Sequence, residues 1–457
     1  MSHQVAIDTS PPEARSMGIL DRSHFRRSVN VLGVKVPPTK AGMVLKAEPM
    51  HGAIINLPRI RSVVDSTSPG SDVKMVLLRV RDTAELPVTV KEYLSSQGLE
   101  LTTHTLELTY DYWTADDILQ AVLPKDLCEG SPVGFTVTGH IAHMNLNSEY
   151  LPYKHLIGQV ILDKNPRLRT VVNKTDTIDT KFRVFKMELI AGVPEYVVQH
   201  HESDSQFTFD FTQVYWNSRL HTEHDRLVRL FRPEDVIADV FAGVGPFAIP
   251  AGKKGCGVFA NDLNPNSYKY LQQNIVDNRV THLVRASCED GREFIRKVVG
   301  WSFTDPMLPY SGPPRSRNQI QKEDKRRQQQ RPEQGVSYPP RRRIAHFVMN
   351  LPESAITFLD AFRGLLAPGA DEDDLRALYD EMPMVHCHCF TRELDPEGAE
   401  RDIRQRVGEQ IGQELCEGDE VSLHFVRKVA PNKDMYCISF RLPRKVAFGE
   451  RASAELS

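Results

Sequence analysis

The sequence predicts an α/β fold: a doubly wound, Rossmann-like sheet that ends in an antiparallel hairpin and follows two smaller α+β domains. From about residue 205, short apolar stretches alternate with helix-like stretches, which is typical of a mostly parallel sheet. The last two apolar stretches are joined by the turn-forming sequence Pro-Asn-Lys-Asp and are therefore expected to pair at the sheet edge. Upstream, residues 20–118 and 119–204 each mix short strands with helices.

Length and composition indicate a soluble protein of several domains. A chain of 457 residues is too long for one compact core. Its 40% hydrophobic and 26% charged residues are ordinary for a globular protein. No stretch approaches the roughly 20 consecutive apolar residues that cross a bilayer, and the N-terminus resembles neither a secretory signal nor a clear mitochondrial presequence. Seven cysteines, an odd number, favour free thiols in a reducing compartment.

Positive charge is concentrated in one segment. The whole chain carries a net charge of −3, but residues 309–343 hold ten Lys and Arg against three Asp and Glu. This segment is rich in Pro, Gln and Arg, so we expect a disordered insertion within the folded C-terminal domain. It is either a basic arm that contacts phosphates or a tolerated loop expansion. Residues 1–19 are also expected to be disordered.

A motif at residues 236–250, VIADVFAGVGPFAIP, indicates a site for an adenosine-bearing cofactor. Asp239 ends an apolar strand, and Gly243 and Gly245 then allow the backbone to approach a ligand. The spacing differs from G-x-G-x-x-G, and the Lys-Ser/Thr of a P-loop is missing, so NAD and nucleoside triphosphates fit poorly. Taken alone, the motif could be any strand-to-helix turn of a Rossmann-like sheet.

The next two strands also end in acids. Asp262 can accept hydrogen bonds from ribose hydroxyls, with Leu263 beside it to pack on adenine. Asp290, followed by Gly291, can accept a hydrogen bond from the adenine amine. An acid after a strand can instead cap the next helix. Three acids at the ends of three successive strands nevertheless favour S-adenosylmethionine.

The fourth strand leads into Asn350-Leu351-Pro352-Glu353. The Asn350 amide offers a carbonyl and an NH2 to the edge of a base, and Pro352 makes the turn rigid. Enzymes of this fold that methylate exocyclic amines place an aromatic residue at the fourth position, where this chain has a glutamate. The target is therefore expected to be something other than an exocyclic amine.

Six segments, in order, resemble the archaeal/eukaryotic tRNA guanine-N1-methyltransferase family: NSRLHTEHDRL, DVFAGVGPFAIP, NDLNP, EDGREF, MNLPESAITFLD and VRKVAPNKDMYCISF. The resemblance covers residues about 125–457 well and the region before them loosely. It implies a class I methyltransferase domain at residues 205–457 that makes 1-methylguanosine at tRNA position 37. It also implies a tRNA-recognition domain at 20–118 and an RNA-contacting domain at 119–204. The basic insertion departs from the compact family pattern.

The resemblance also implies roles for individual residues. Glu223 corresponds to the base that removes the N1 proton, and Arg183 to the arginine that holds guanine O6. Glu223 could instead form an ion pair with Arg226 or Arg229, and Arg183 could be solvated or contact a phosphate. The expected catalytic residues are Glu223, Arg183, Asn350 and Pro352; the expected cofactor residues are His224, Asp239, Gly243, Gly245, Asp262, Leu263, Asp290, Gly291 and Asn350; the expected substrate residues are Arg183, Tyr215 and Arg219.

The resemblance also implies a partner, cellular locations and a wider role for the product. tRNA would be bound at its anticodon stem-loop and tertiary core by a monomer without membrane contact, acting in the cytoplasm, nucleus and mitochondrial matrix. The product would be the first step toward wybutosine and would help to maintain the reading frame. His386-Cys387-His388-Cys389 alternates as a strand does, so no metal is expected. The rivals are an aminocarboxypropyl transferase of the wybutosine pathway and a non-catalytic tRNA-binding protein.

Overall fold

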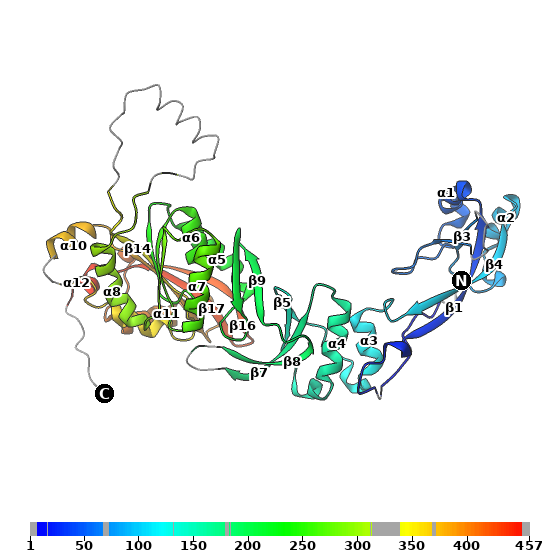
Figure 1. Ribbon diagram of the computed structural model, residues 1–457, viewed down its shortest axis with the longest axis horizontal. Coiled ribbons are helices and arrows are strands. Elements are labelled where there is room, and N and C mark those ends of the chain that lie inside the picture. The colour runs from blue at the N-terminus through cyan, green and yellow to red at the C-terminus, as the bar shows by residue number, and fades with distance from the viewer. Residues whose placement is uncertain are drawn as a thin grey trace, which may run out of the picture. The chain divides into compact units, whose positions relative to one another are not determined.

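The protein is described by a computed structural model and divides into two compact units (Figure 1). Unit 1 comprises residues 1–175 and 187–195, and unit 2 comprises residues 176–186 and 196–457. No described helix is both long and apolar enough to span a bilayer. The structure describes residues 7–15, 17–66, 73–130, 132–178, 182, 184–310, 312, 339–367 and 372–449.

Unit 1 contains two sheets of four strands among its described residues. The first has the antiparallel order β2 (Val63–Asp65), β3 (Lys74–Leu77), β1 (Arg26–Val36) and β4 (Glu100–Thr109), with helices α1 (Pro38–Lys46) and α2 (Val88–Ser96). The second has the order β5 (Thr136–Thr138), β6 (Ile141–Met144), β7 (Thr170–Ile178) and β8 (Phe185–Gly192), with helices α3 (Ala115–Val122) and α4 (Lys154–Lys164).

The two α+β regions that were expected as separate domains lie largely in unit 1, and residues 176–186 and 196–204 of the second region belong to unit 2. A single hydrophobic core contains Leu106 and Trp113 from the first region and Ile157 and Val171 from the second. The expected boundary at residues 204 and 205 falls at the turn between β9 (Val197–Glu202) and β10 (Ser205–Asp210), which pair with each other. Both strands therefore belong to unit 2, which starts again at Tyr196.

Residues 7–15 are ordered, contrary to the expectation of a disordered N-terminus. Trp113 Nε1 donates to the carbonyl of Thr9 at 2.8 Å. The amide of Ala14 donates to the carbonyl of Ala121 at 2.9 Å, and Arg15 Nη1 donates to that of Leu123 at 2.7 Å. The carbonyls of Ala121 and Leu123 lie at the C-terminus of α3, where the helix itself leaves them without partners. The segment is held because it satisfies them. Residues 1–6 lie outside the described residues.

Unit 2 is built on a mixed sheet that confirms the predicted parallel strands and C-terminal hairpin. Strand β17 is antiparallel to both of its neighbours, and β16 lies at the edge. Strands β12 and β13 lie on one side of β11, and β14 and β15 lie on the other. In such sheets ligands bind at the carboxyl ends of the strands where the order reverses, which here are β11 and β14. The strand order of this sheet is β13 (Val284–Ser287), β12 (Gly257–Asn261), β11 (Val236–Asp239), β14 (Ile344–Met349), β15 (Met384–Thr391), β17 (Lys433–Arg441) and β16 (Ser422–Ala430).

Helices cover this sheet, and one face of it carries the larger apolar core. That core contains residues of α8 (Gly291–Thr304), the 3-10 helix η7 (Ala355–Phe362) and α11 (Pro396–Ile411). Helix α5 (His221–Leu230) contacts β15 through Glu223 and His388. The remaining described α-helices of unit 2 are α6 (Ala248–Lys254), α7 (Pro265–Asp277), α10 (Glu372–Leu378) and α12 (Arg444–Phe448).

The two ends of the basic insertion are fastened to each other and to the domain. Met307 and Arg341 form an antiparallel bridge. The Arg341 guanidinium donates to the carbonyls of Leu308 at 2.6 Å, Pro233 at 3.0 Å and Gly255 at 2.8 Å. Residues 311 and 313–338 lie outside the described residues, so the expected disorder of the insertion stays a prediction.

We predict that Arg341→Ala lowers the free energy of unfolding by about 2 kcal/mol, because three carbonyl groups lose a charged donor. The measurement is chemical denaturation of the full chain. Arg401→Ala is the matched control, since its pair with Glu397 is 3.9 Å long and both side chains are largely exposed; it should change stability little. Equal effects of the two variants would contradict the prediction.

Candidate functional site

The structure brings the predicted cofactor residues together at the carboxyl edge of β11, β12, β13 and β14. The amide of Gly243, in the turn after β11, donates to Asp262 Oδ2 at 2.8 Å. Gly291 packs against the same turn, because a Cβ atom there would lie 2.8 Å from the ring of Phe241. Asn350 follows β14, which pairs directly with β11. One edge of the sheet therefore carries these residues, whereas His224 lies on helix α5.

Two glycines shape the turn after β11. Gly243 and Gly245 have φ values of +55° and +102°, in the left-handed region that favours glycine. At Gly245 a Cβ would lie 2.8 Å from the side chain of Ile249, so the position also requires glycine for packing. At Gly243 a Cβ would meet no heavy atom within 4 Å. The backbone of Gly243 therefore borders open space, as a close approach to a ligand requires.

Asp239 is the strongest sign of a ligand site. Its side chain is completely buried, and neither carboxylate oxygen has a hydrogen-bond partner among the described residues. Burial, with the charge of nearby Asp262, raises the pKa of Asp239 to about 8. The Oδ1 atom of Asn350 is likewise buried without a described partner. Buried acceptors of this kind call for donors, which a bound ligand can supply.

The other two acids are already engaged by the backbone. Asp262 accepts hydrogen bonds from the amides of Gly243 and Asn264, and burial raises its pKa. It does not cap the next helix, because the side chain of Asn264 caps α7. Asp290 does cap its helix: Oδ1 accepts from the first amides of α8. Leu263 is 41% exposed beside them. The cofactor contacts of these residues stay predictions.

Glu223, the expected base, lies in a buried ion pair. Arg226 holds its carboxylate with two hydrogen bonds of 2.6 and 2.7 Å. His388 Nε2 lies 2.7 Å from Oε1, and the glutamate is 3% exposed. Burial raises the pKa of Glu223, but the hydrogen bonds from Arg226 and His388 outweigh it and lower the pKa to about 2. Of the two arginines that could pair with Glu223, Arg226 does so, whereas Arg229 pairs with Asp225.

His388 is a site residue that the sequence did not reveal. Burial lowers its pKa, but Cys437 and Glu223 outweigh that effect and raise it to about 10. His424 Nε2 lies 3.6 Å from the other side of the Glu223 carboxylate, and that histidine is 48% exposed. The alternation in MVHCHCF correctly predicted strand β15, and it places His386 and His388 on one face. No local signal shows that this face meets α5.

Glu223, His388 and Cys437 have ligand atoms within 4.8 Å of one another, which is close enough to hold a metal ion. Both oxygens of Glu223, however, already accept hydrogen bonds from Arg226. A metal ion bound there would face the guanidinium at short range without a free carboxylate oxygen. We therefore assign the cluster to an ion pair.

Of the remaining predicted residues, His224 lies on α5, and Tyr215 and Arg219 lie in the segment that leads into it. His224 is buried next to the turn after β11, with its ring edge against Phe247 at 4.8 Å and Nδ1 2.5 Å from Glu202 Oε1. Tyr215 is 44% exposed, and Arg219 is exposed in the 3-10 helix that precedes α5.

The turn after Asn350 is tied to β15, because the amide of Phe390 donates to the carbonyl of Pro352 at 3.1 Å. Asn350 and Pro352 therefore lie on a fixed turn beside β11. Arg183, the residue expected to hold guanine O6, lies outside the described residues.

Comparison with known proteins matches this chain to one enzyme family. Residues 115–195 match the TYW2 N-terminal domain, and residues 198–302 match the TRM5/TYW2 methyltransferase domain. The chain is 59% identical to a tRNA (guanine(37)-N(1))-methyltransferase of Coprinopsis cinerea, over 97% of this chain and 98% of that protein. It is 46% identical to the Schizosaccharomyces pombe protein of the same name, over 95% and 96%.

A solved structure supports the fold. The complex of aTrm5 and tRNALeu aligns with a TM-score of 0.59 and 18% identity, over 90% of this chain and all of that one. At this identity the likeness concerns the fold alone. It agrees with the mixed α/β sheet of unit 2.

We predict that Asp239→Asn stabilises the protein in the absence of cofactor, by about 1–3 kcal/mol at pH 8. The raised pKa keeps Asp239 protonated up to about pH 8 in the folded protein, whereas in the unfolded chain its pKa has the ordinary value of 3.8. Wild-type stability therefore falls as the pH rises from about 4 to 8, and an amide avoids this loss.

Thermal unfolding at pH 5 and pH 8 measures the difference, which should shrink at pH 5. Glu400→Gln is the matched control, because Glu400 lies on α11 with its side chain 51% exposed, in a pair with Arg404. S-adenosylmethionine binding by calorimetry should weaken in Asp239→Asn alone. No gain in stability at pH 8 would show that the buried carboxyl is not strained.

Proposed function

The chain belongs to the tRNA (guanine(37)-N(1))-methyltransferase family, and from this premise we propose that it methylates N1 of guanosine 37 in tRNA, using S-adenosylmethionine. The observation that supports the proposal best is the 59% identity to the Coprinopsis cinerea enzyme over nearly the full length of both chains. The unpartnered carboxylate of Asp239 supports the cofactor assignment independently. The enzyme is a methyltransferase that acts on one nucleotide of an RNA substrate.

In this proposal the acids at the sheet edge hold the cofactor. Asp239 and Asp262 accept hydrogen bonds from its ribose and amino groups, and Asp290 from the adenine amine. Gly243 leaves room for it, Gly245 and Gly291 allow the turn after β11 to pack closely beside it, Leu263 packs on the adenine, and His224 lines the site. Bound S-adenosylmethionine supplies a methyl group already activated by its sulfonium, so the reaction needs no metal ion.

Glu223 would accept the proton of guanine N1. As the N1–H bond breaks, N1 forms its bond to the methyl carbon and the sulfur–carbon bond breaks. A carboxylate whose pKa is about 2 is a weak base, so the contacts that lower this pKa must loosen when tRNA binds. Arg226 is the partner able to move, because its side chain is 26% exposed while that of His388 is fully buried.

The remaining assignments follow the family pattern. Asn350 would orient the guanine edge, and Arg183 would stabilise the charge that gathers on O6. Pro352 fixes the turn after Asn350, and Tyr215 and Arg219 would line the substrate side. The target base would leave its loop to reach the site, as RNA targets in single-stranded loops do.

The wider roles are proposals of the same kind. Residues 20–118 and 119–204 would bind the tertiary core and the anticodon stem-loop of the tRNA, with the protein acting as a monomer. The product would lead toward wybutosine and help to maintain the reading frame. We place the protein in the cytoplasm, nucleus and mitochondrial matrix, which fluorescence microscopy of a tagged chain would test.

The second candidate is transfer of an aminocarboxypropyl group. The matched domain models cover both TRM5 and TYW2 proteins, so the domains alone do not distinguish the two reactions. The relatives most similar to this chain carry the methyltransferase name, which favours methyl transfer. The mass of the product nucleoside separates the two.

We predict that the purified protein forms 1-methylguanosine at position 37 of an unmodified tRNA transcript, and that Glu223→Gln lowers kcat by roughly 10²–10⁴-fold. The amide keeps the shape of the side chain but cannot take a proton. Radiolabelled methyl transfer gives the rate, and nucleoside mass spectrometry gives the product.

Asp225→Asn is the matched control on the same helix and should keep the wild-type rate. S-adenosylmethionine affinity should be unchanged in both variants. A carboxypropyl adduct, or no product from the wild-type protein, would overturn the proposed reaction. A fully active Glu223→Gln would overturn only the assignment of the base.

A further inference from the structure

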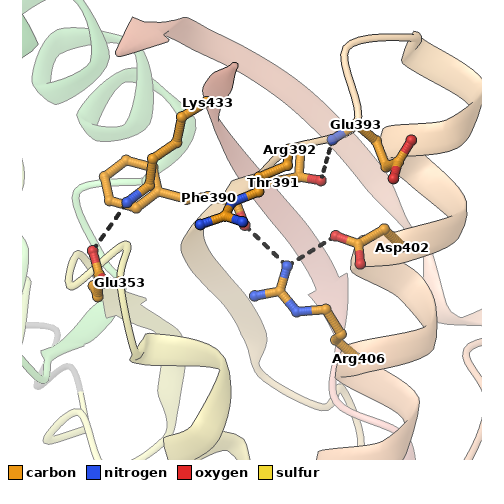
Figure 2. A pocket seen from close by; sticks show the side chains of 8 residues that line it. All are labelled: Glu353, Phe390, Thr391, Arg392, Glu393, Asp402, Arg406 and Lys433. Carbon is orange, nitrogen blue, oxygen red and sulfur yellow. Dashed lines mark hydrogen bonds and ion pairs between the residues drawn. The ribbon is translucent and has the colours of Figure 1, made fainter. Parts of the chain in front are cut away.

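A cavity of about 340 Å³ lies at the carboxyl end of β15 (Figure 2). Its lining includes none of the residues assigned above to the cofactor or to the target guanine. Three of the lining side chains are basic and three are acidic, with one aromatic ring among them. They are Glu353, Phe390, Thr391, Arg392, Glu393, Asp402, Arg406 and Lys433.

The cavity neighbours the proposed active site along two elements. Phe390 follows His388 by two residues on the same side of β15, a separation of roughly 7 Å along a strand. The amide of Phe390 donates to the carbonyl of Pro352, and Glu353 is the next residue of that turn. A ligand in the cavity would therefore lie beside whatever occupies the site formed by Asn350 and Glu223.

The contacts around the cavity hold its polar groups in place. Arg406 Nη1 donates to the carbonyl of Phe390 and to Asp402, both at 2.9 Å. Lys433 Nζ lies 4.2 Å from the centre of the Phe390 ring and 3.2 Å from Glu353. Figure 2 shows Lys433 beside the ring of Phe390, with the side chain of Arg392 close to it.

The chemistry of the lining fits a nucleobase better than a simple anion. A phosphate in the cavity would face three carboxylates as well as three cations. A base, in contrast, offers both donors and acceptors at its edge: arginine and lysine donate to ring nitrogens and carbonyls, and carboxylates accept from exocyclic amines. Its flat face stacks on an aromatic ring or a guanidinium, as unpaired bases do in RNA-binding proteins.

We propose that this cavity holds the nucleobase adjacent to the target guanosine. This inference rests on the proposed function, because it takes the RNA loop to be seated on the same edge of the sheet. When the target base leaves its stack, its neighbour loses a stacking partner. Phe390 and Arg392 would replace that partner, so the neighbouring base would contribute to binding.

The experiment compares tRNA transcripts that carry an abasic residue at position 36 or at position 38 with the intact transcript. For the wild-type enzyme, one of the two abasic substrates should show a KM raised roughly tenfold. Phe390→Ala and Arg392→Ala should each raise the KM for intact tRNA, and should add little further loss with that same abasic substrate. Such non-additivity is the mark of a direct contact.

Phe425→Ala is the matched control, because Phe425 is a half-exposed aromatic residue on β16 that packs on Tyr436. It should respond to the abasic residues as the wild type does. Thermal unfolding and S-adenosylmethionine affinity of each variant show whether it folds. Arg392 is exposed, so Arg392→Ala tests the proposal even if Phe390→Ala fails to fold.

Two outcomes would overturn the inference. Additive losses would mean that the cavity does not contact the neighbouring base. A fall in kcat that is the same for every substrate would mean that the cavity holds the target guanine itself. Failure of the proposed function is distinguishable from both, because the wild-type enzyme would then form no 1-methylguanosine at position 37.

Discussion

The buried carboxylate of Glu223 is the constraint on which the site depends. An isolated charge at this depth would be costly, so the fold must supply partners for it. Arg226 comes from the next turn of the same helix, but His388 comes from β15, 165 residues away in the sequence. The pair therefore fixes α5 on the face of β15. Removing either partner would leave the buried carboxylate with one close cationic partner instead of two, so the position of the proposed base is tied to the assembly of the sheet.

Asp239 shows the opposite solution to the same physical problem. It is as deeply buried as Glu223 but has no described partner, and its pKa rises to about 8 where that of Glu223 falls to about 2. A structure that only had to be stable would not keep such a group. Such a group is expected where a ligand completes its hydrogen bonds. The two carboxylates therefore differ in role: Asp239 lacks protein donors and would need a ligand, whereas Glu223 already has donors from the protein.

The sequence predicted what depends on local pattern. The alternation of apolar and helical stretches gave the parallel strands, the turn sequence gave the hairpin, and the two-residue period of MVHCHCF gave β15. It did not predict what depends on tertiary contact. His388 seemed an ordinary strand residue because nothing near it in sequence shows what it faces. Residues 7–15 contain no periodic signal, and they are ordered because they satisfy the carbonyls at the end of α3.

Strand β15 runs from the buried centre at Glu223 to the cavity, and its surroundings change along its length. His386 and His388 are buried in its middle, and Phe390 and Arg392 become progressively more exposed at its end. Charge in the middle is neutralised by protein partners, whereas charge and aromatic surface at the end border a cavity. Space for a ligand lies at the end of the strand, although Arg406 and Lys433 there already pair with Asp402 and Glu353. A loop of RNA that approaches this edge would therefore meet the open cavity first and the closed carboxylate of Glu223 second.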